Sequence, residues 1–174
     1  LFSDKPILGG TDVRRYMTAD AAVLQNGDIV VVSSFRAVNG YYTMLSENGL
    51  VMIRSKDGGA TWSEEKIIYV GTTWEPYVLE LPSGEIQVYF TAPAEMISLY
   101  GYKSERVSSG VGLIRSADGG ETWTPDVKEA PYATQMIIKQ FTTIRSDGVK
   151  CFTDQMPSAI LLHNGSIGVA LESQ

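Results

Sequence analysis

The chain has 174 residues, of which 14 are Lys or Arg and 20 are Asp or Glu, so its formal net charge is −6. An acidic chain without a basic cluster argues against nucleic acid as partner and against an anionic membrane surface, and no apolar run approaches the ~18 residues of a membrane span. Because Cys151 and His163 are the single residues of their types, a disulfide framework and a Cys- or His-based metal site are excluded, and we expect neither metal nor cofactor.

Three segments along the chain share one pattern: an apolar run, a turn with glycine, and a second apolar run. They are residues 21–33 (AAVLQNGDIVVVS), 77–90 (YVLELPSGEIQVYF) and 158–171 (SAILLHNGSIGVAL). The Asn-Gly and Ser-Gly dipeptides supply the positive φ that a tight hairpin requires. We therefore predict three β-hairpins.

A second pattern follows the first two hairpins. The sequence SKDGGATW at residues 55–62 recurs as SADGGETW at residues 116–123, each time after an apolar strand that ends in Ile-Arg. The carboxylate and hydroxyls can hydrogen-bond the turn backbone, the glycines can take positive φ, and the tryptophan can pack beneath the strands. We assign a structural role to ten of these residues: Ser55, Asp57, Gly59, Thr61, Trp62, Ser116, Asp118, Gly120, Thr122 and Trp123.

Each unit thus reads strand, glycine turn, strand, long loop, strand, Ser-x-Asp turn, strand. Four antiparallel strands in about 50–60 residues are typical of a propeller blade. We predict an all-β fold in which residues 1–174 form part of one β-propeller domain of four-stranded antiparallel blades. Blade one covers about 15–70, blade two about 74–124 with an extra hairpin at 135–153, and blade three begins at 154–174, which makes about two and a half blades.

The eight-residue motif resembles the Asp box, the repeat of bacterial neuraminidases and of the wider sialidase-like superfamily. The resemblance implies six blades when the propeller is complete. Because an open half-propeller leaves a bare sheet edge, we expect the remaining blades to come from a longer chain or from a partner. The resemblance also implies a secreted or periplasmic protein, although no signal peptide is recognisable after Leu1.

Alternate turns of an antiparallel blade lie on the same face, so the longer loops gather on the face opposite to the glycine turns. Functional residues of propellers are concentrated where such loops meet the central channel. The strand ends on that face carry Arg15, Arg36, Glu75, Asp154, Met156 and Glu172. Two partly desolvated carboxylates around one pocket suit glycoside hydrolysis.

A family resemblance gives these positions roles. The segment WEP at 74–76 and the segment DQMP at 154–157, each followed by a hairpin, look like stretches of the exo-acting arabinanases of glycoside hydrolase family 93. The resemblance implies that Glu75 is the acid/base and Glu172 the nucleophile. We further predict that Arg15, Arg36, Trp74 and Asp154 bind substrate.

The predicted function is therefore an exo-acting retaining glycoside hydrolase that removes terminal sugars from an oligosaccharide or polysaccharide. Three alternatives stay open: a non-catalytic carbohydrate-binding propeller, a sialidase proper, and a protein-interaction scaffold. Arg15 and Arg36 loosely resemble carboxylate-binding arginines of sialidases. However, the loop at residues 40–49 (GYYTMLSENG) lacks the aspartate that a sialidase would place there.

Overall fold

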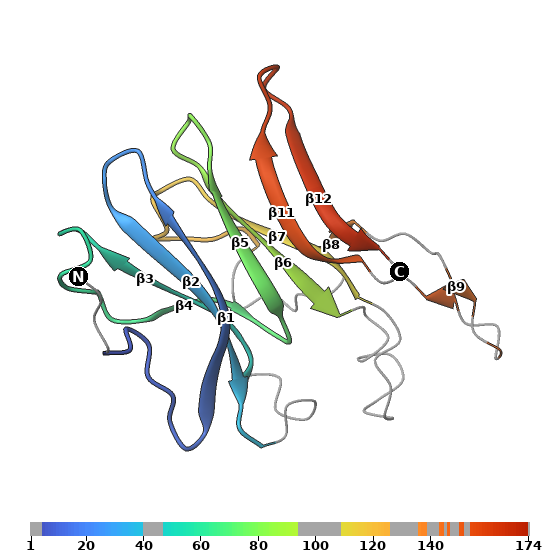
Figure 1. The fold of residues 1–174 in the computed structure, drawn as a ribbon, viewed down its shortest axis with the longest axis horizontal. Coiled ribbons are helices and arrows are strands. Elements are labelled where there is room, and N and C mark those ends of the chain that lie inside the picture. Colours follow the sequence, from blue (N-terminus) through green and yellow to red (C-terminus); the bar gives the residue numbers. More distant parts are fainter. Residues whose placement is uncertain are drawn as a thin grey trace.

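The computed structural model describes residues 5–39, 47–93, 109–125, 136–138, 143–144, 146, 150–151 and 154–173. This part of the chain is all-β, contains no α-helix, and is built from antiparallel sheets (Figure 1). Most of the loop at 40–49 and the loop at 126–135 lie outside the described residues. Within the described ranges no helix is long and apolar enough to cross a membrane.

The first sheet has four strands in the order of the sequence. They are β1 (Arg14–Val23), β2 (Ile29–Ala37), β3 (Gly49–Ser55) and β4 (Lys66–Val70), and each pairs antiparallel with the next. This sheet covers the stretch predicted as the first unit.

The second sheet contains β5 (Trp74–Glu80), β6 (Ile86–Pro93), β7 (Ser109–Ser116) and β8 (Met136–Ile138). Its fourth strand lies beyond the predicted boundary at residue 124, because Thr124 makes only an isolated bridge to Arg115. Pro125 follows directly, and a proline has no N–H with which to extend the ladder. The fourth strand therefore comes from the segment predicted as an extra hairpin, whose later part is the separate pair β9 (Thr143–Ile144) and β10 (Lys150–Cys151).

The third pair of strands, β11 (Asp154–Leu161) and β12 (Ile167–Ser173), is an antiparallel hairpin. Its turn has the same form as the turns of β1–β2 and β5–β6, and the three turns lie along one side of the molecule (Figure 1). Gly27, Gly84 and Gly165 have φ values of 88°, 84° and 82°, and each donates its N–H to the leucine three residues earlier. The three predicted hairpins and their positive-φ glycines are confirmed.

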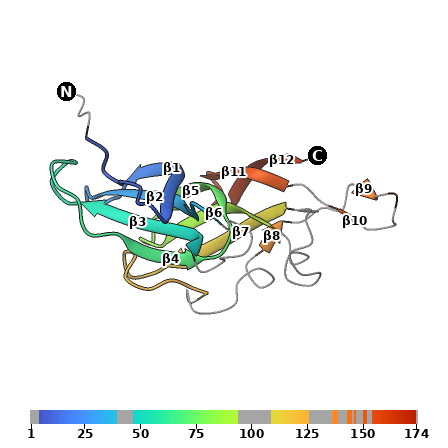
Figure 2. The same cartoon turned by 90° about the horizontal axis from the view of Figure 1, so that it is seen from below.

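The two four-stranded sheets and the hairpin pack face to face, with β1, β5 and β11 along one side (Figure 2). One core cluster joins the first and second sheets, including Val32 and Val88. A second cluster joins the second sheet to the hairpin, including Leu113 and Ala159. Because the second sheet is covered on both faces, β6 and β7 read as nearly continuous apolar runs.

The two Ser-x-Asp turns make the same internal hydrogen bonds. In the first turn Ser55 Oγ donates to Asp57 at 2.8 Å, the Gly59 N–H donates to Ser55 Oγ at 2.8 Å, and the Thr61 hydroxyl donates to Asp57 at 2.6 Å. The same contacts recur among Ser116, Asp118, Gly120 and Thr122. Both aspartates thus stabilise their turns.

The tryptophans of the two turns differ. Trp123 is buried in the cluster between the first two sheets and donates its indole N–H to the Gly120 carbonyl at 3.1 Å, whereas Trp62 is half-buried. The prediction of a packed tryptophan therefore holds fully for the second turn alone.

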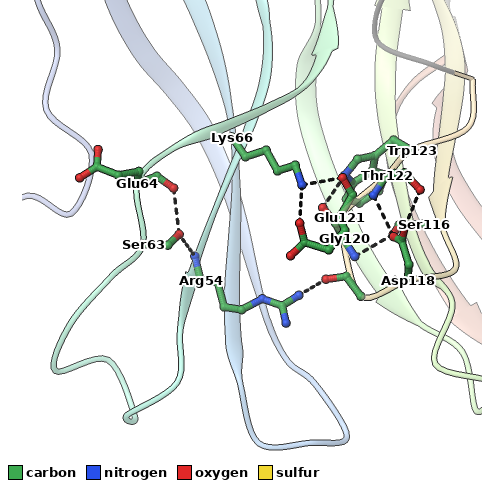
Figure 3. A network of polar contacts seen from close by, with 11 residues as sticks. Arg54, Ser63, Glu64, Lys66, Ser116, Asp118, Gly120, Glu121, Thr122 and Trp123 are labelled. Carbon is green, nitrogen blue, oxygen red and sulfur yellow. Dashed lines mark hydrogen bonds and ion pairs between the residues drawn. The ribbon is translucent and has the colours of Figure 1, made fainter.

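Polar contacts also tie the second turn to the first sheet (Figure 3). The Arg54 guanidinium donates to the Gly119 carbonyl, and its other arm pairs with Asp28 at 3.0 Å. Lys66 binds both the carbonyl of Glu121, at 2.5 Å, and its carboxylate, at 2.9 Å. The turn is thus a structural joint between neighbouring sheets.

Candidate functional site

The first strand of each hairpin is interrupted at the same place, close to its start. The register shifts between Tyr16 and Ala19 in β1, between Trp74 and Tyr77 in β5, and between Gln155 and Ser158 in β11. Bulges of this kind redirect side chains and are over-represented beside functional sites. The three bulges lie at the end of the hairpins opposite to the glycine turns.

Two residues inside these bulges have left-handed backbones. Glu75 has a φ of 48° and Met156 a φ of 53°, and they are the two non-glycine residues with positive φ in the described part of the chain. Each precedes a proline, Pro76 or Pro157. Such conformations cost on the order of 1–3 kcal/mol, and they persist where the surrounding structure enforces them, often at functional sites.

Hydroxyl groups of neighbouring strands fix Glu75. Its N–H donates to Thr18 Oγ1 on β1 at 2.9 Å. Its Oε2 accepts a hydrogen bond from Thr91 Oγ1 on β6 at 2.7 Å. The same Thr91 oxygen accepts the N–H of Met156 at 2.9 Å, so one buried hydroxyl connects both left-handed residues.

Glu172 lies on β12 directly opposite Gln155, and its side chain is half-buried. Gln155 donates its side-chain N–H to Glu172 Oε2 at 3.1 Å. Thr91 thus contacts both Glu75 and Met156, and Met156 follows Gln155, which binds Glu172. These contacts connect Glu75 to the strand pair that carries Glu172. The two predicted carboxylates therefore lie at the same end of neighbouring hairpins.

Trp74 and Arg36 form an aromatic and cationic pair beside Glu75. The Arg36 guanidinium lies 5.3 Å from the centre of the Trp74 ring, and both side chains are half-buried. Arg15 is the direct cross-strand partner of Arg36 and is exposed. Two cations paired across strands repel each other, so this position favours an anion or an aromatic ring between or beside them.

Asp154 differs from its predicted role. Its side chain is fully buried, and the Ser173 hydroxyl donates to it at 2.8 Å. Its counterpart in the second sheet, Thr73, is also fully buried, because in both sheets the strand start is packed against the preceding sheet. In this structure Asp154 therefore holds the end of β12, next to Glu172, and offers no surface to a substrate.

Two residues of the site were missed by sequence reasoning: Thr18 and Thr91. A signal for the bulges was present, because proline near the start of a strand is tolerated at a bulge. No sequence pattern identifies the two threonines, whose roles depend on which strand lies across from Glu75. Among the described residues no group of three or more His, Cys, Asp or Glu side chains could hold a metal ion.

Comparison with known proteins supports the fold. No family model matches the sequence, and no curated protein does. A crystal structure of a protein of unknown function from Dyadobacter fermentans DSM 18053 superimposes with a TM-score of 0.58 at 19% identity, covering 91% of this chain and 46% of that one. A protein named as an endo-1,4-beta-xylanase from Bacteroides thetaiotaomicron VPI-5482 superimposes with a TM-score of 0.51 at 10% identity, covering 98% of this chain and 52% of that one. The chain thus spans about half the length of each structure it resembles, and at these identities the likeness concerns the fold alone.

Proposed function

We propose that the protein is an exo-acting retaining glycoside hydrolase of the Asp-box propeller type, with Glu75 as acid/base and Glu172 as nucleophile. The observation that carries the proposal is the geometry of Glu75: a left-handed backbone at a strand bulge, with one carboxylate oxygen held by a buried hydroxyl. A carboxylate held this way is oriented before substrate arrives, which is how preorganised groups accelerate reactions.

The reaction needs two carboxyl groups on opposite sides of the scissile bond. Glu75 gives its proton to the leaving-group oxygen while Glu172 attacks the anomeric carbon, so that the glycosidic bond breaks and a glycosyl ester forms. A water molecule then gives a proton back to Glu75 and attacks the same carbon, which releases Glu172. Retention predicts carboxyl groups about 5–5.5 Å apart in the substrate complex.

Neighbouring side chains support a sugar ligand. Trp74 offers an aromatic ring beside Glu75, and Arg36 and Arg15 offer hydrogen-bond donors at the same strand ends. The name of the Bacteroides protein, a xylanase, is in keeping with a carbohydrate substrate. From the sequence motifs we also propose that the complete protein is a six-bladed propeller related to glycoside hydrolase family 93.

The test uses the full-length protein and a panel of aryl glycosides and plant or bacterial polysaccharides. We expect release of terminal sugar with retained anomeric configuration, read by proton NMR. Glu172→Gln is expected to abolish turnover while leaving ligand affinity, measured by calorimetry, within a few-fold of wild type. Glu75→Gln is expected to lose about 10²–10⁴ in kcat on unactivated substrates and much less on activated aryl glycosides, which need little protonation.

Glu64→Gln, an exposed carboxylate before β4, is the matched control and should behave as wild type. Wild-type activity in either site variant would remove the mechanism. Binding of a glycan without turnover by the wild-type protein would favour the carbohydrate-binding alternative.

A further inference from the structure

We infer that Thr91 is the positioning residue of the general acid, and that it leaves Oε1 of Glu75 as the oxygen that exchanges the proton with the leaving group. This inference rests on the proposed function and deepens it. The observation behind it is that one hydroxyl contacts both the Glu75 carboxylate and the Met156 backbone.

The direction of each hydrogen bond follows from chemistry. The Met156 N–H can only donate, so the Thr91 oxygen accepts there at 2.9 Å. A hydroxyl carries one hydrogen, which is left for Glu75 Oε2 at 2.7 Å. Oε2 is therefore occupied while Glu75 is ionised, and the proton is carried on Oε1, from which it passes to the leaving-group oxygen.

Burial makes this contact specific. Thr91 has no exposed surface and lies between Trp74 on β5 and Val111 on β7. Water has no direct route to the hydroxyl itself, because Thr91 has no exposed surface. Without the hydroxyl, the Glu75 carboxylate would rotate and the Met156 N–H would lose its acceptor.

The same hydroxyl relates the two carboxylates to each other. Met156 follows Gln155, which binds Glu172, and Glu75 belongs to the second sheet. Thr91 therefore fixes where β11 lies relative to Glu75, and with it the distance between acid and nucleophile. Misplacement of reacting groups by about 1 Å costs on the order of 10²-fold in rate.

The experiment compares Thr91→Val, which is isosteric but has no hydroxyl, with Thr91→Ser, which keeps it, in the full-length protein. Thr73→Val is the matched control, because Thr73 is equally buried and its hydroxyl donates to the Gly49 carbonyl at 3.1 Å. Each variant is assayed on two glycosides of the same sugar, one with an unactivated and one with an activated leaving group.

We expect Thr91→Val to lower kcat on the unactivated glycoside by about 10–100-fold, with a much smaller loss on the activated one and little change in KM. Thr91→Ser should recover most of the rate. Thr73→Val should lower the melting temperature by a similar amount and leave the ratio of the two rates unchanged.

Equal losses on both glycosides, an altered rate ratio in Thr73→Val, or no recovery in Thr91→Ser would overturn the inference. If the wild-type protein cleaves no glycoside, the proposed function fails by itself. Crystal structures of wild type and Thr91→Val then decide on Thr91: a displaced Glu75 carboxylate supports the positioning role, and an unmoved one overturns it.

Discussion

At the scale of single residues, the aspartates of the two Ser-x-Asp turns show how hydrogen bonds stabilise a charge. The Thr61 side chain is the largest cause that lowers the pKa of Asp57 from 3.8 to about 2, followed by the Thr61 backbone N–H and the Ser55 hydroxyl. The Thr122 side chain likewise holds the pKa of Asp118 well below its usual range. In both turns the bonds favour the ionised carboxylate.

These shifts make stability depend on pH in acid. Because the folded-state pKa lies below the unfolded value of about 3.9, the stabilisation is complete above about pH 4 and is lost as the pH falls towards 2. We expect Asp57→Asn and Asp118→Asn to lower the melting temperature at pH 6 and to flatten its decline between pH 4 and 2.

Circular dichroism melts at closely spaced pH values measure this decline. Thr61→Val removes the largest cause acting on Asp57 and should give an intermediate curve. A wild-type pH curve in Asp57→Asn would contradict the assigned role.

The residues of the site could be predicted from the sequence only in part. Glu75 and Glu172 stand at the ends of apolar strands, so their place at one edge of the fold follows from topology. The role of Thr91 depends on the contact between β6 and β11, which no local pattern reveals. Asp154 is predicted to bind substrate, and its full burial depends on the neighbouring sheet, which no local pattern reveals.

At the scale of elements, strong local signals gave correct predictions and weak ones did not. The three glycine hairpins were predicted because positive φ and alternation of apolar runs are both visible in the sequence. The hairpin predicted at 135–153 contains the strand β8 (Met136–Ile138), but the bounds of this strand could not be predicted, since three residues carry too little periodicity and a long segment separates them from β7. Its pairing with Val111 and Gly112 is determined by tertiary packing and not by the local sequence.

The strands differ in how tightly they pack, and two glycines test this difference. A Cβ on Gly112 of β7 would lie 2.7 Å from Cε2 of the buried Phe90 ring, whereas a Cβ on Gly168 of β12 would lie 3.6 Å from its nearest neighbour. We expect Gly112→Ala to lower the free energy of unfolding by about 1–3 kcal/mol through overpacking. Gly168→Ala should be neutral or stabilise by up to about 1 kcal/mol, because it restricts the unfolded chain.

Urea denaturation of both variants measures these changes. A double variant, Gly112→Ala with Phe90→Leu, provides the control, since a smaller side chain at 90 makes room for the added methyl group. Equal stability of the two single variants would show that β7 is no more tightly packed at this point than β12.

At the scale of the whole molecule, neighbouring sheets are joined by an apolar core and by a small set of polar contacts. Arg54 of β3 binds Asp28, which directly precedes β2, and the Arg54 side chain is 18% exposed. The same guanidinium donates to the Gly119 carbonyl in the second turn (Figure 3). Arg115 holds the corresponding position in β7. Its side chain is 55% exposed and pairs with Glu85 at 3.8 Å.

Arg115 is therefore a matched control for Arg54, because the two occupy corresponding positions in β7 and β3 but differ in burial and in their contacts. Arg54→Ala removes hydrogen bonds of a charged group in a partly buried place, so we expect it to lower the free energy of unfolding by about 1–3 kcal/mol. Arg115→Ala removes a long, exposed ion pair and should change it by less than about 0.5 kcal/mol.

Hydrogen exchange distinguishes a loss at the joint from a general loss of stability. The N–H groups of Gly120 and Thr122 are bonded within the second turn, and that turn is anchored to the first sheet through Arg54. In Arg54→Ala these two amides should exchange faster by more than the global loss of stability explains, while Gly59 and Thr61 in the first turn should follow the global change. Arg54→Lys keeps the charge but has a single donor group, so it should restore part of the protection. If Arg115→Ala destabilised the protein as much as Arg54→Ala, the contacts that Arg54 makes across the joint would contribute no more to stability than a long, exposed ion pair.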